Sequence, residues 1–167
     1  STYGSKLRAG RCQFSLFDGG LITLAAKDHV NAAAVAQIQQ SLELAHFKVK
    51  SVADPYLALW HKAAINCAIN PMATILRCEN GALSSESLLQ HCAQLAVEVA
   101  LVANALAIPL PKDLYYWKEA VAQVCQATAK NRCSMLSDWE AGRPTEIDSL
   151  SGEVLKVAKL HGIACPL

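Results

Sequence analysis

Three residues, Lys62, Asn66 and Asn70, have types and a spacing that suggest chemistry. They follow one another at intervals of four, so on a helix each lies about one turn beyond the last and together they form a polar stripe. A solvated helix face is the ordinary explanation for a single lysine. Two asparagines at matched spacing weaken that explanation, because asparagine is a poor helix former and exposed faces more often carry Glu, Lys or Gln. The stripe indicates either a row of hydrogen-bond donors lining a cleft or a solvated face.

A second candidate group contains Ser134 and Glu146. The pair Thr145-Glu146 is also typical of a helix start, since threonine caps helix N-termini and glutamate favours the positive end of the helix macrodipole. A helix start explains the glutamate but neither the serine nor the pair Gly142-Arg143. Both interpretations stay open from the residues alone.

Several classes of function find no support in the 167 residues. The net charge of +1 argues against a basic nucleic-acid-binding surface. The five histidines show no metal-ligand spacing, so no metal site is expected, and the glycines form neither a phosphate loop nor a G-x-G-x-x-G fingerprint. The seven cysteines include no C-x-x-C pair and are odd in number, which favours free thiols in a reducing cytosol. The most apolar stretch, 88–109, contains too many polar residues for a membrane span.

The first 52 residues have the pattern of a small β-rich segment. Two β-prone runs flank Gly19-Gly20, which is a hairpin signal, and an amphipathic helix and a further strand follow. The expected elements are strands over 12–18 and 21–26, a helix over 31–45 and a strand over 47–52. Because so few strands rarely stand alone in water, we expect them to be the last strands of a sheet that begins earlier in a longer protein.

From residue 54 onward the pattern is helical. Asp54 is a good N-cap with Pro55 at the first helical position, and this helix runs to Pro71 or continues past a kink there. The expected helices cover residues 55–76, 85–107, 112–129, 133–140 and 146–160, the last ending before Gly162. The sequence therefore predicts a mainly α fold with a small β remnant, divided into residues 1–52 and 53–167.

The chain carries five spaced motifs, Leu59-Trp60-His61-Lys62-Ala63-Ala64-Ile65-Asn66-Cys67-Ala68-Ile69-Asn70-Pro71, Asn80-Gly81, Ser134-Met135-Leu136-Ser137-Asp138, Gly142-Arg143-Pro144-Thr145-Glu146-Ile147-Asp148 and His161-Gly162-Ile163-Ala164-Cys165-Pro166. In this order they resemble ketopantoate reductase (2-dehydropantoate 2-reductase). The resemblance implies a Rossmann-type N-terminal domain that binds NADPH, of which residues 1–52 are the end. It also implies an all-helical C-terminal domain for substrate and catalysis over 53–167, of the 6-phosphogluconate-dehydrogenase C-terminal-like type. The glycine-rich cofactor loop of the family is absent from this sequence.

The resemblance also implies roles for individual residues. Lys62 matches the catalytic lysine, which donates the proton to the substrate ketone, and Glu146 matches a glutamate that contacts the cofactor and helps to organise that lysine. The residues implied in substrate binding are Asn66, Asn70, Asn80 and, at the carboxylate end, Ser134. Lys6 lies in the segment Ser1 to Leu7, which matches a loop after a Rossmann strand that can approach the cofactor, at a position that varies within the family.

The implied function is the reduction of 2-dehydropantoate to (R)-pantoate with NADPH, in cytoplasmic pantothenate (vitamin B5) biosynthesis. A lysine ammonium can stabilise and protonate the oxygen of a ketone that receives a hydride, and the hydride itself must come from a cofactor. This chain alone is expected to be inactive, with a 2-oxo acid as its small-molecule partner and neither nucleic acid nor membrane. The alternatives are a reductase of a different 2-oxo acid and a helical dimerisation module without activity, because an Ala-rich helix over 88–107 would suit a homodimer interface.

Overall fold

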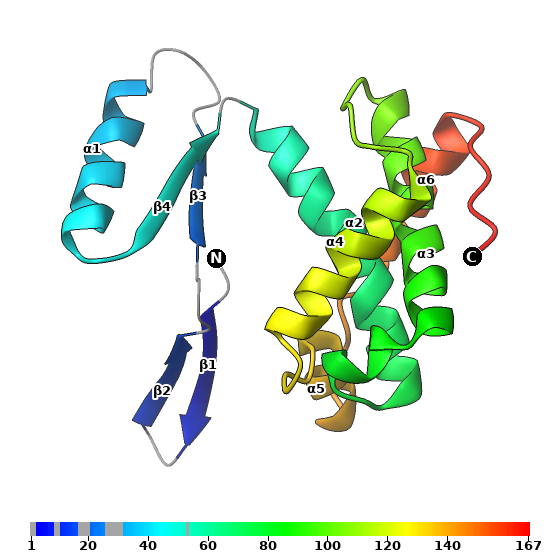
Figure 1. Ribbon diagram of the computed structural model, residues 1–167, viewed down its shortest axis with the longest axis horizontal. Coiled ribbons are helices and arrows are strands. Elements are labelled where there is room, and N and C mark those ends of the chain that lie inside the picture. The colour runs from blue at the N-terminus through cyan, green and yellow to red at the C-terminus, as the bar shows by residue number, and fades with distance from the viewer. Residues whose placement is uncertain (1–2, 9–10, 17–20, 26–31, 53) are drawn as a thin grey trace. The chain divides into compact units, whose positions relative to one another are not determined.

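The computed structural model describes residues 3–8, 11–16, 21–25, 32–52 and 54–167 (Figure 1). The chain divides into two compact units, Ser1–Ala58 and Leu59–Leu167. Most of the described residues are helical and a small part forms short strands, so the predicted mainly α fold is confirmed. The predicted division after residue 52 into a cofactor part and a substrate part stays a prediction.

The described residues of the first unit form two pairs of strands. β1 (Tyr3–Arg8) pairs antiparallel with β2 (Arg11–Leu16), and β3 (Leu21–Ala25) pairs parallel with β4 (Lys48–Val52). α1 (Ala32–Leu44) lies between β3 and β4 in the chain and supplies the long crossover that a parallel pair requires. The strands predicted over 12–18, 21–26 and 47–52 are present as β2, β3 and β4, whereas β1 was not predicted. The predicted hairpin between β2 and β3 is wrong, because β2 pairs with β1. The Gly19-Gly20 turn itself lies outside the described residues.

α2 (Pro55–Leu76) is a single helix that carries the polar stripe found in the sequence. Asp54 caps it as predicted, because its Oδ1 accepts the backbone N–H of Tyr56 at 2.8 Å. Pro71 lies inside the helix, where it has no N–H to donate to the carbonyl one turn earlier. The helix continues beyond this proline, which is the longer of the two extents that the sequence allowed.

The other helices of the second unit follow with short connections. They are η2 (Asn80–Ser84), α3 (Glu86–Ala105), α4 (Leu114–Ala127), α5 (Ser134–Glu140), η3 (Asp148–Gly152) and α6 (Glu153–Leu160). The helix predicted over 146–160 differs at its start, because η3 is a wide π turn that precedes α6. Gly162 follows α6 with a φ of +66°, a left-handed conformation that glycine adopts without strain.

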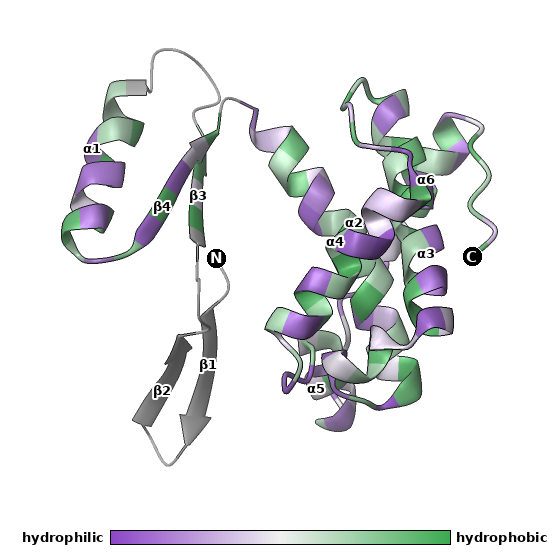
Figure 2. Ribbon diagram, viewed as in Figure 1, coloured by the Kyte–Doolittle hydropathy of each residue, from purple (hydrophilic) through white to green (hydrophobic). Residues whose placement is uncertain are grey.

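α3 packs against α4, α6 and η2. Its length and composition would suffice to cross a membrane, but its buried residues belong to the same core as the fully buried Trp117 and Val121 of α4. Figure 2 shows hydrophobic and hydrophilic residues alternating along α3 and α4, as expected of helices with one inward face. α3 is therefore a core helix of this unit.

Candidate active site

The stripe on α2 passes from the surface into the core of the second unit. Lys62 is exposed, Asn66 is half-buried and Asn70 is only 7% exposed. Lys62 takes part in none of the ion pairs of the described residues. Its ammonium is therefore available to a ligand, whereas the buried amide of Asn70 needs hydrogen-bond partners within the protein.

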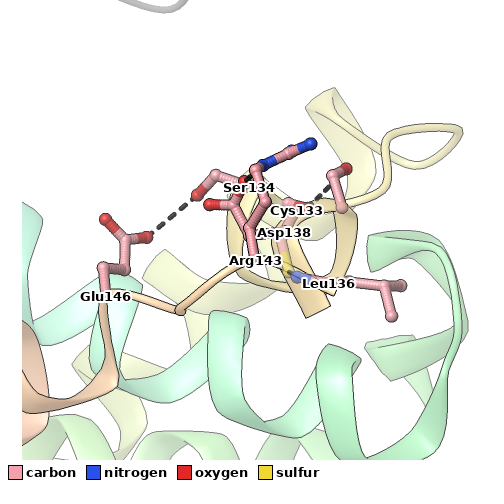
Figure 3. A network of polar contacts seen from close by, with 7 residues as sticks. Cys133, Ser134, Leu136, Asp138, Arg143 and Glu146 are labelled. Atoms are coloured by element: carbon pink, nitrogen blue, oxygen red, sulfur yellow. Dashed lines mark hydrogen bonds and ion pairs between the residues drawn. The ribbon is translucent and has the colours of Figure 1, made fainter. Parts of the chain in front are cut away.

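Glu146 is the partner of Asn70 and joins it to Ser134. Oε1 of Glu146 accepts a hydrogen bond from Nδ2 of Asn70 at 3.2 Å and another from Oγ of Ser134 at 2.9 Å. Figure 3 shows the serine and the carboxylate directed toward each other, the serine from α5 and the carboxylate from the segment before η3. The structure thus brings together three predicted site residues that lie far apart in the sequence.

A tight turn after α5 carries the chain back toward Glu146 (Figure 3). Nε and Nη2 of Arg143 both donate to Oδ1 of Asp138, at 2.9 and 2.6 Å, and the backbone N–H of Arg143 donates to the carbonyl of Asp138. Gly142 has a φ of +66°, which a side chain at this position would strain. The Gly142-Arg143 pair singled out in the sequence therefore closes this turn.

Two residues without a predicted role, Thr74 and Cys133, contact the backbone of Asn70. Oγ1 of Thr74 donates to the carbonyl of Asn70 at 2.7 Å, and Sγ of Cys133 donates to the same oxygen at 3.6 Å. Thr74 extends the spacing of four that links Lys62, Asn66 and Asn70, so the periodicity contained a signal for it. The only signal for Cys133 is its place immediately before the predicted serine.

Four predicted site residues lie outside this hydrogen-bonded group: Lys62 and Asn66 on the same helix as Asn70, and Asn80 and Lys6 on other elements. Asn80 begins η2, where its Nδ2 donates to Oγ1 of Thr128 at 2.9 Å and its backbone N–H donates to the carbonyl of Asn131. Oδ1 of Asn80 is buried and accepts no hydrogen bond from the described residues. Lys6 lies on β1 of the first unit, opposite Gln13 in the strand register, so the loop that the resemblance implies for this segment is wrong.

His61 precedes Lys62 on α2 and belongs to an aromatic group with Tyr116 and Trp117. Its Nε2 lies 3.0 Å from the hydroxyl of Tyr116, and its ring centroid lies 4.9 Å from that of Trp117. Partial burial lowers the pKa of His61 below its ordinary value, which favours the neutral imidazole.

A cavity of about 240 Å³ adjoins a different face of α2, where Cys67, Pro71 and mostly apolar residues of α3, η3 and α6 line it. None of the predicted site residues lines this cavity. Within the described part of the chain, no three His, Cys, Asp or Glu side chains are grouped as metal ligands would be. The candidate site therefore offers one ammonium, one carboxylate and several neutral hydrogen-bonding groups.

A family model described as ketopantoate reductase PanE/ApbA C terminal matches residues 55–167 of this chain. A curated 2-dehydropantoate 2-reductase from Vibrio cholerae is 43% identical over 110 residues, which are 66% of this chain and 36% of that protein. The chain therefore spans about a third of the length of this relative.

Solved structures of similar fold cover nearly the whole chain. The ternary structure of D-mandelate dehydrogenase with NADH and anilino(oxo)acetate has a TM-score of 0.86 at 23% identity, and the match covers 99% of this chain and 54% of that chain. A dimeric ketopantoate reductase from Staphylococcus aureus has a TM-score of 0.78 at 17% identity, and the match covers 99% of this chain and 55% of that chain. At these identities the agreement shows a shared fold.

Proposed function

We propose, since this chain belongs to the ketopantoate reductase family, that it is the substrate-binding half of an enzyme that reduces 2-dehydropantoate to (R)-pantoate with NADPH. The enzyme would serve pantothenate biosynthesis in the cytoplasm. The observation that supports this proposal best is the convergence of Asn70 and Ser134 on one oxygen of Glu146, in the same unit as the exposed Lys62.

In the proposed reaction a hydride adds to the ketone carbon of the 2-oxo acid, and the electron pair of the C=O π bond moves onto the oxygen. Lys62 stabilises the negative charge that develops there and donates the proton that completes the alcohol. Because Lys62 is exposed, the amine that remains after this transfer can regain a proton from solvent. Asn66 and Asn70 orient the substrate as neutral hydrogen-bonding groups, and Ser134 donates to the substrate carboxylate.

NADPH supplies the hydride when it is bound. Glu146 is the residue of this chain that would hold part of the cofactor. Its Oε1 takes both of the described hydrogen bonds, which leaves Oε2 as an acceptor for a hydroxyl or an amide N–H, and this acceptor fits the carboxamide at the nicotinamide end. We assign the pyrophosphate to another domain of the complete enzyme, because the sequence has no glycine-rich turn. Lys6 stays a predicted cofactor contact.

Asn80 stays a predicted substrate contact of a different kind from Asn70. Its amide nitrogen is engaged by Thr128, whereas its Oδ1 has no donor among the described residues. A substrate hydroxyl would satisfy that oxygen. We therefore assign Asn80 the role of a hydrogen-bond acceptor.

A reductase of a different 2-oxo acid is the second candidate. The similarity in fold to D-mandelate dehydrogenase supports it, because that enzyme acts on a hydroxy acid with a bulky aromatic group. The lysine and the carboxylate-binding serine would serve both reactions. The candidates differ in the walls around the substrate side chain.

The dimerisation-module alternative loses its main support. The alanines of α3 on which it depends are fully buried within their own unit; they are Ala93, Ala96, Ala100 and Ala103. They cannot at the same time form an interface with a second copy. A homodimer of the complete enzyme stays a proposal, made by comparison with the dimeric Staphylococcus aureus enzyme.

Steady-state assays of the complete protein with a panel of 2-oxo acids distinguish the two candidates. The panel contains 2-dehydropantoate, phenylglyoxylate and pyruvate, each with NADPH and with NADH. We expect kcat/KM for 2-dehydropantoate with NADPH to exceed the other values by more than ~10-fold, since pocket walls discriminate by about 1–3 kcal/mol per misfitting group. A preference for another acid would favour the second candidate. Reduction of none of them would show that the proposal is wrong.

A further inference from the structure

Cys133 lies at the start of α5, directly before Ser134, and contacts α2 at Asn70. It is only 8% exposed and occupies the N-cap position of α5. Its Sγ accepts the backbone N–H of Leu136 at 3.4 Å, so the sulfur takes the place of the oxygen of a usual capping residue. Figure 3 shows Cys133 adjoining Ser134 at the start of α5. The thiol thereby fixes the turn of backbone from which the serine projects.

The same sulfur also contacts α2. It lies 3.6 Å from the carbonyl oxygen of Asn70 and 3.7 Å from Oγ1 of Thr74. Thr74 donates to that carbonyl oxygen at 2.7 Å, so the hydroxyl, the thiol and the carbonyl form one small polar group. Because Cys133 is almost fully buried, water cannot replace these contacts.

Two connections therefore join α2 to α5 at neighbouring points. One is the carboxylate of Glu146, which accepts from the side chains of Asn70 and Ser134. The other is the thiol of Cys133, which contacts the backbone of Asn70 and caps the helix that begins with Ser134. The thiol acts on the backbones and the carboxylate on the side chains of the same two residues.

We propose that Cys133 is a positioning residue, whose thiol holds the start of α5 against the backbone of Asn70 so that Asn70 and Ser134 meet the substrate at a fixed separation. The proposal rests on the proposed function for the identity of the substrate. A displacement of about 1 Å can cost up to ~10²-fold in rate, so even a weak contact is effective where it sets a distance. Cys133 itself does not touch the substrate.

Kinetics of Cys133→Ala and Cys133→Ser in the complete protein test this proposal. Ala removes both the cap and the contact with Asn70, and we expect the KM for 2-dehydropantoate to rise about tenfold, with a smaller change in kcat. Ser retains a capping hydroxyl and a donor toward Asn70, and we expect it to restore the KM to within about threefold of the wild-type value. A Ser variant no better than the Ala variant would overturn the proposal.

Cys125→Ala is the matched control, because Cys125 is also buried, in α4, and none of the hydrogen bonds found among the described residues joins its side chain to the site. Both Ala variants should lose thermal stability, whereas only Cys133→Ala should raise the KM. An equal rise of the KM in the two Ala variants would show that Cys133 contributes only to packing, and it would overturn the proposal.

A double-mutant cycle shows whether Cys133 acts through Asn70. In an Asn70→Ala background, Cys133→Ala should raise the KM by much less than it does in the wild-type background, since the group that it positions is already gone. Additive effects would overturn the proposal. If Cys133→Ala does not fold, Thr74→Val replaces it, because this variant removes the hydroxyl that contacts the carbonyl of Asn70. A wild-type KM in Thr74→Val would also overturn the proposal.

A failure of the proposed function can be distinguished from a failure of the role proposed for Cys133. If the proposed function is wrong, the wild-type protein itself reduces no 2-oxo acid. In that case a cycle of Cys133→Ala with Thr74→Val is measured on the midpoint of urea unfolding, because both side chains contact the carbonyl of Asn70 and their coupling should appear as non-additive shifts. Additive shifts there would overturn the positioning role.

Discussion

Glu146 receives two hydrogen bonds on one oxygen, and the two donors differ in their surroundings. Asn70 is buried, so its amide depends on the carboxylate, whereas Ser134 is exposed and can exchange Glu146 for another acceptor. Hydrogen bonds to an ionised carboxylate are roughly twice as strong as those between neutral groups. Glu146 therefore holds Asn70 firmly, while the hydroxyl of Ser134 can be recruited by a substrate carboxylate.

Glu146→Ala should weaken substrate binding more than Glu146→Gln. Alanine leaves the buried amide of Asn70 without an acceptor, which costs about 1–3 kcal/mol of stability, whereas the carbonyl of glutamine can still accept. We expect the KM for the 2-oxo acid to rise about tenfold in the Ala variant, because the substrate must then order a side chain that Glu146 no longer holds, and ~1.4 kcal/mol corresponds to a factor of ten. Steady-state assays that give the wild-type KM for both variants would contradict this role.

Two core thiols should make the stability of the second unit sensitive to alkaline pH. Burial raises the pKa of Cys92 to about 12 and that of Cys125 to about 11. These folded-state pKa values lie above the pKa of ~8.5 in the unfolded chain. The contribution of the two protonated thiols to the free energy of unfolding is therefore fully present below about pH 8.5, and it is lost as the pH rises toward the folded-state pKa values. We expect the free energy of unfolding in urea to fall from about pH 8.5 to about pH 11.

The double variant Cys92→Ala/Cys125→Ala is the control for this effect. It should be less stable than the wild type near neutral pH, because it leaves cavities in the core, but its stability should fall less with rising pH. An equally steep fall in the double variant would assign the alkaline effect to other groups.

The helices were predictable because their signals are local. The cap at Asp54 and the end at Gly162 each depend on a single residue, and the apolar periodicity between such residues extends over several turns. The partner of β2 was not predictable, because the residues of a strand do not specify which strand it pairs with. The Gly19-Gly20 pair favoured a hairpin with the run over 21–26, whereas β2 pairs with β1. The π turn η3 was missed because one wide turn hardly disturbs a helical pattern.

The site was predictable only in part, for a similar reason. The spacing of four predicted that Asn66 and Asn70 share a face of α2, because that relation is local. The contact between Asn70 and Glu146, 76 residues apart, follows from packing; the family resemblance gave each residue a role in the site but did not predict this contact. The engagement of the Asn80 amide by Thr128 had no local signal at all.

Two glycine substitutions in the second unit should have opposite effects on stability. A Cβ on Gly81 would lie 2.9 Å from Cβ of Ala129 and 3.0 Å from its carbonyl oxygen, so Gly81→Ala should destabilise by about 1–3 kcal/mol. A Cβ on Gly152 has its nearest neighbour at 3.7 Å and the backbone there is helical, so Gly152→Ala should stabilise by up to ~1 kcal/mol. Thermal unfolding of the two variants measures both signs, and a stabilised Gly81→Ala would contradict the packing of η2 against residue 129.

The chain as a whole combines a β-containing unit with a helical unit that carries the candidate site. It spans about a third of the Vibrio cholerae relative and about half of the D-mandelate dehydrogenase chain. The proposed substrate-binding groups and the proposed catalytic lysine lie on the helical unit, whereas the glycine-rich turn that holds a pyrophosphate does not occur in these residues. The proposed function therefore assigns the binding of the pyrophosphate to another part of the enzyme.

The 167-residue chain by itself should not bind NADPH tightly. Binding of the pyrophosphate needs several backbone N–H groups at a helix N-terminus after a glycine-rich turn, and this sequence has no such turn. Calorimetric titration should give no saturable heat at micromolar concentrations. A micromolar dissociation constant would contradict the assignment of cofactor binding to another domain.

The turnover of Lys62→Ala in the complete protein tests the catalytic role of the α2 stripe most directly. Lys112→Ala is the control, since Lys112 is exposed in the segment between α3 and α4 and has no role in the site. With 2-dehydropantoate and NADPH, kcat should fall by about 10²–10³ in Lys62→Ala, because one well-placed donor to the developing oxyanion is typically worth that factor. The thermal midpoint should stay unchanged, because the side chain is exposed, and the control should keep the wild-type kcat. If Lys62→Ala retains more than about half of the wild-type turnover, where a loss of ~100-fold is expected, Lys62 is part of a solvated face and is not the proton donor.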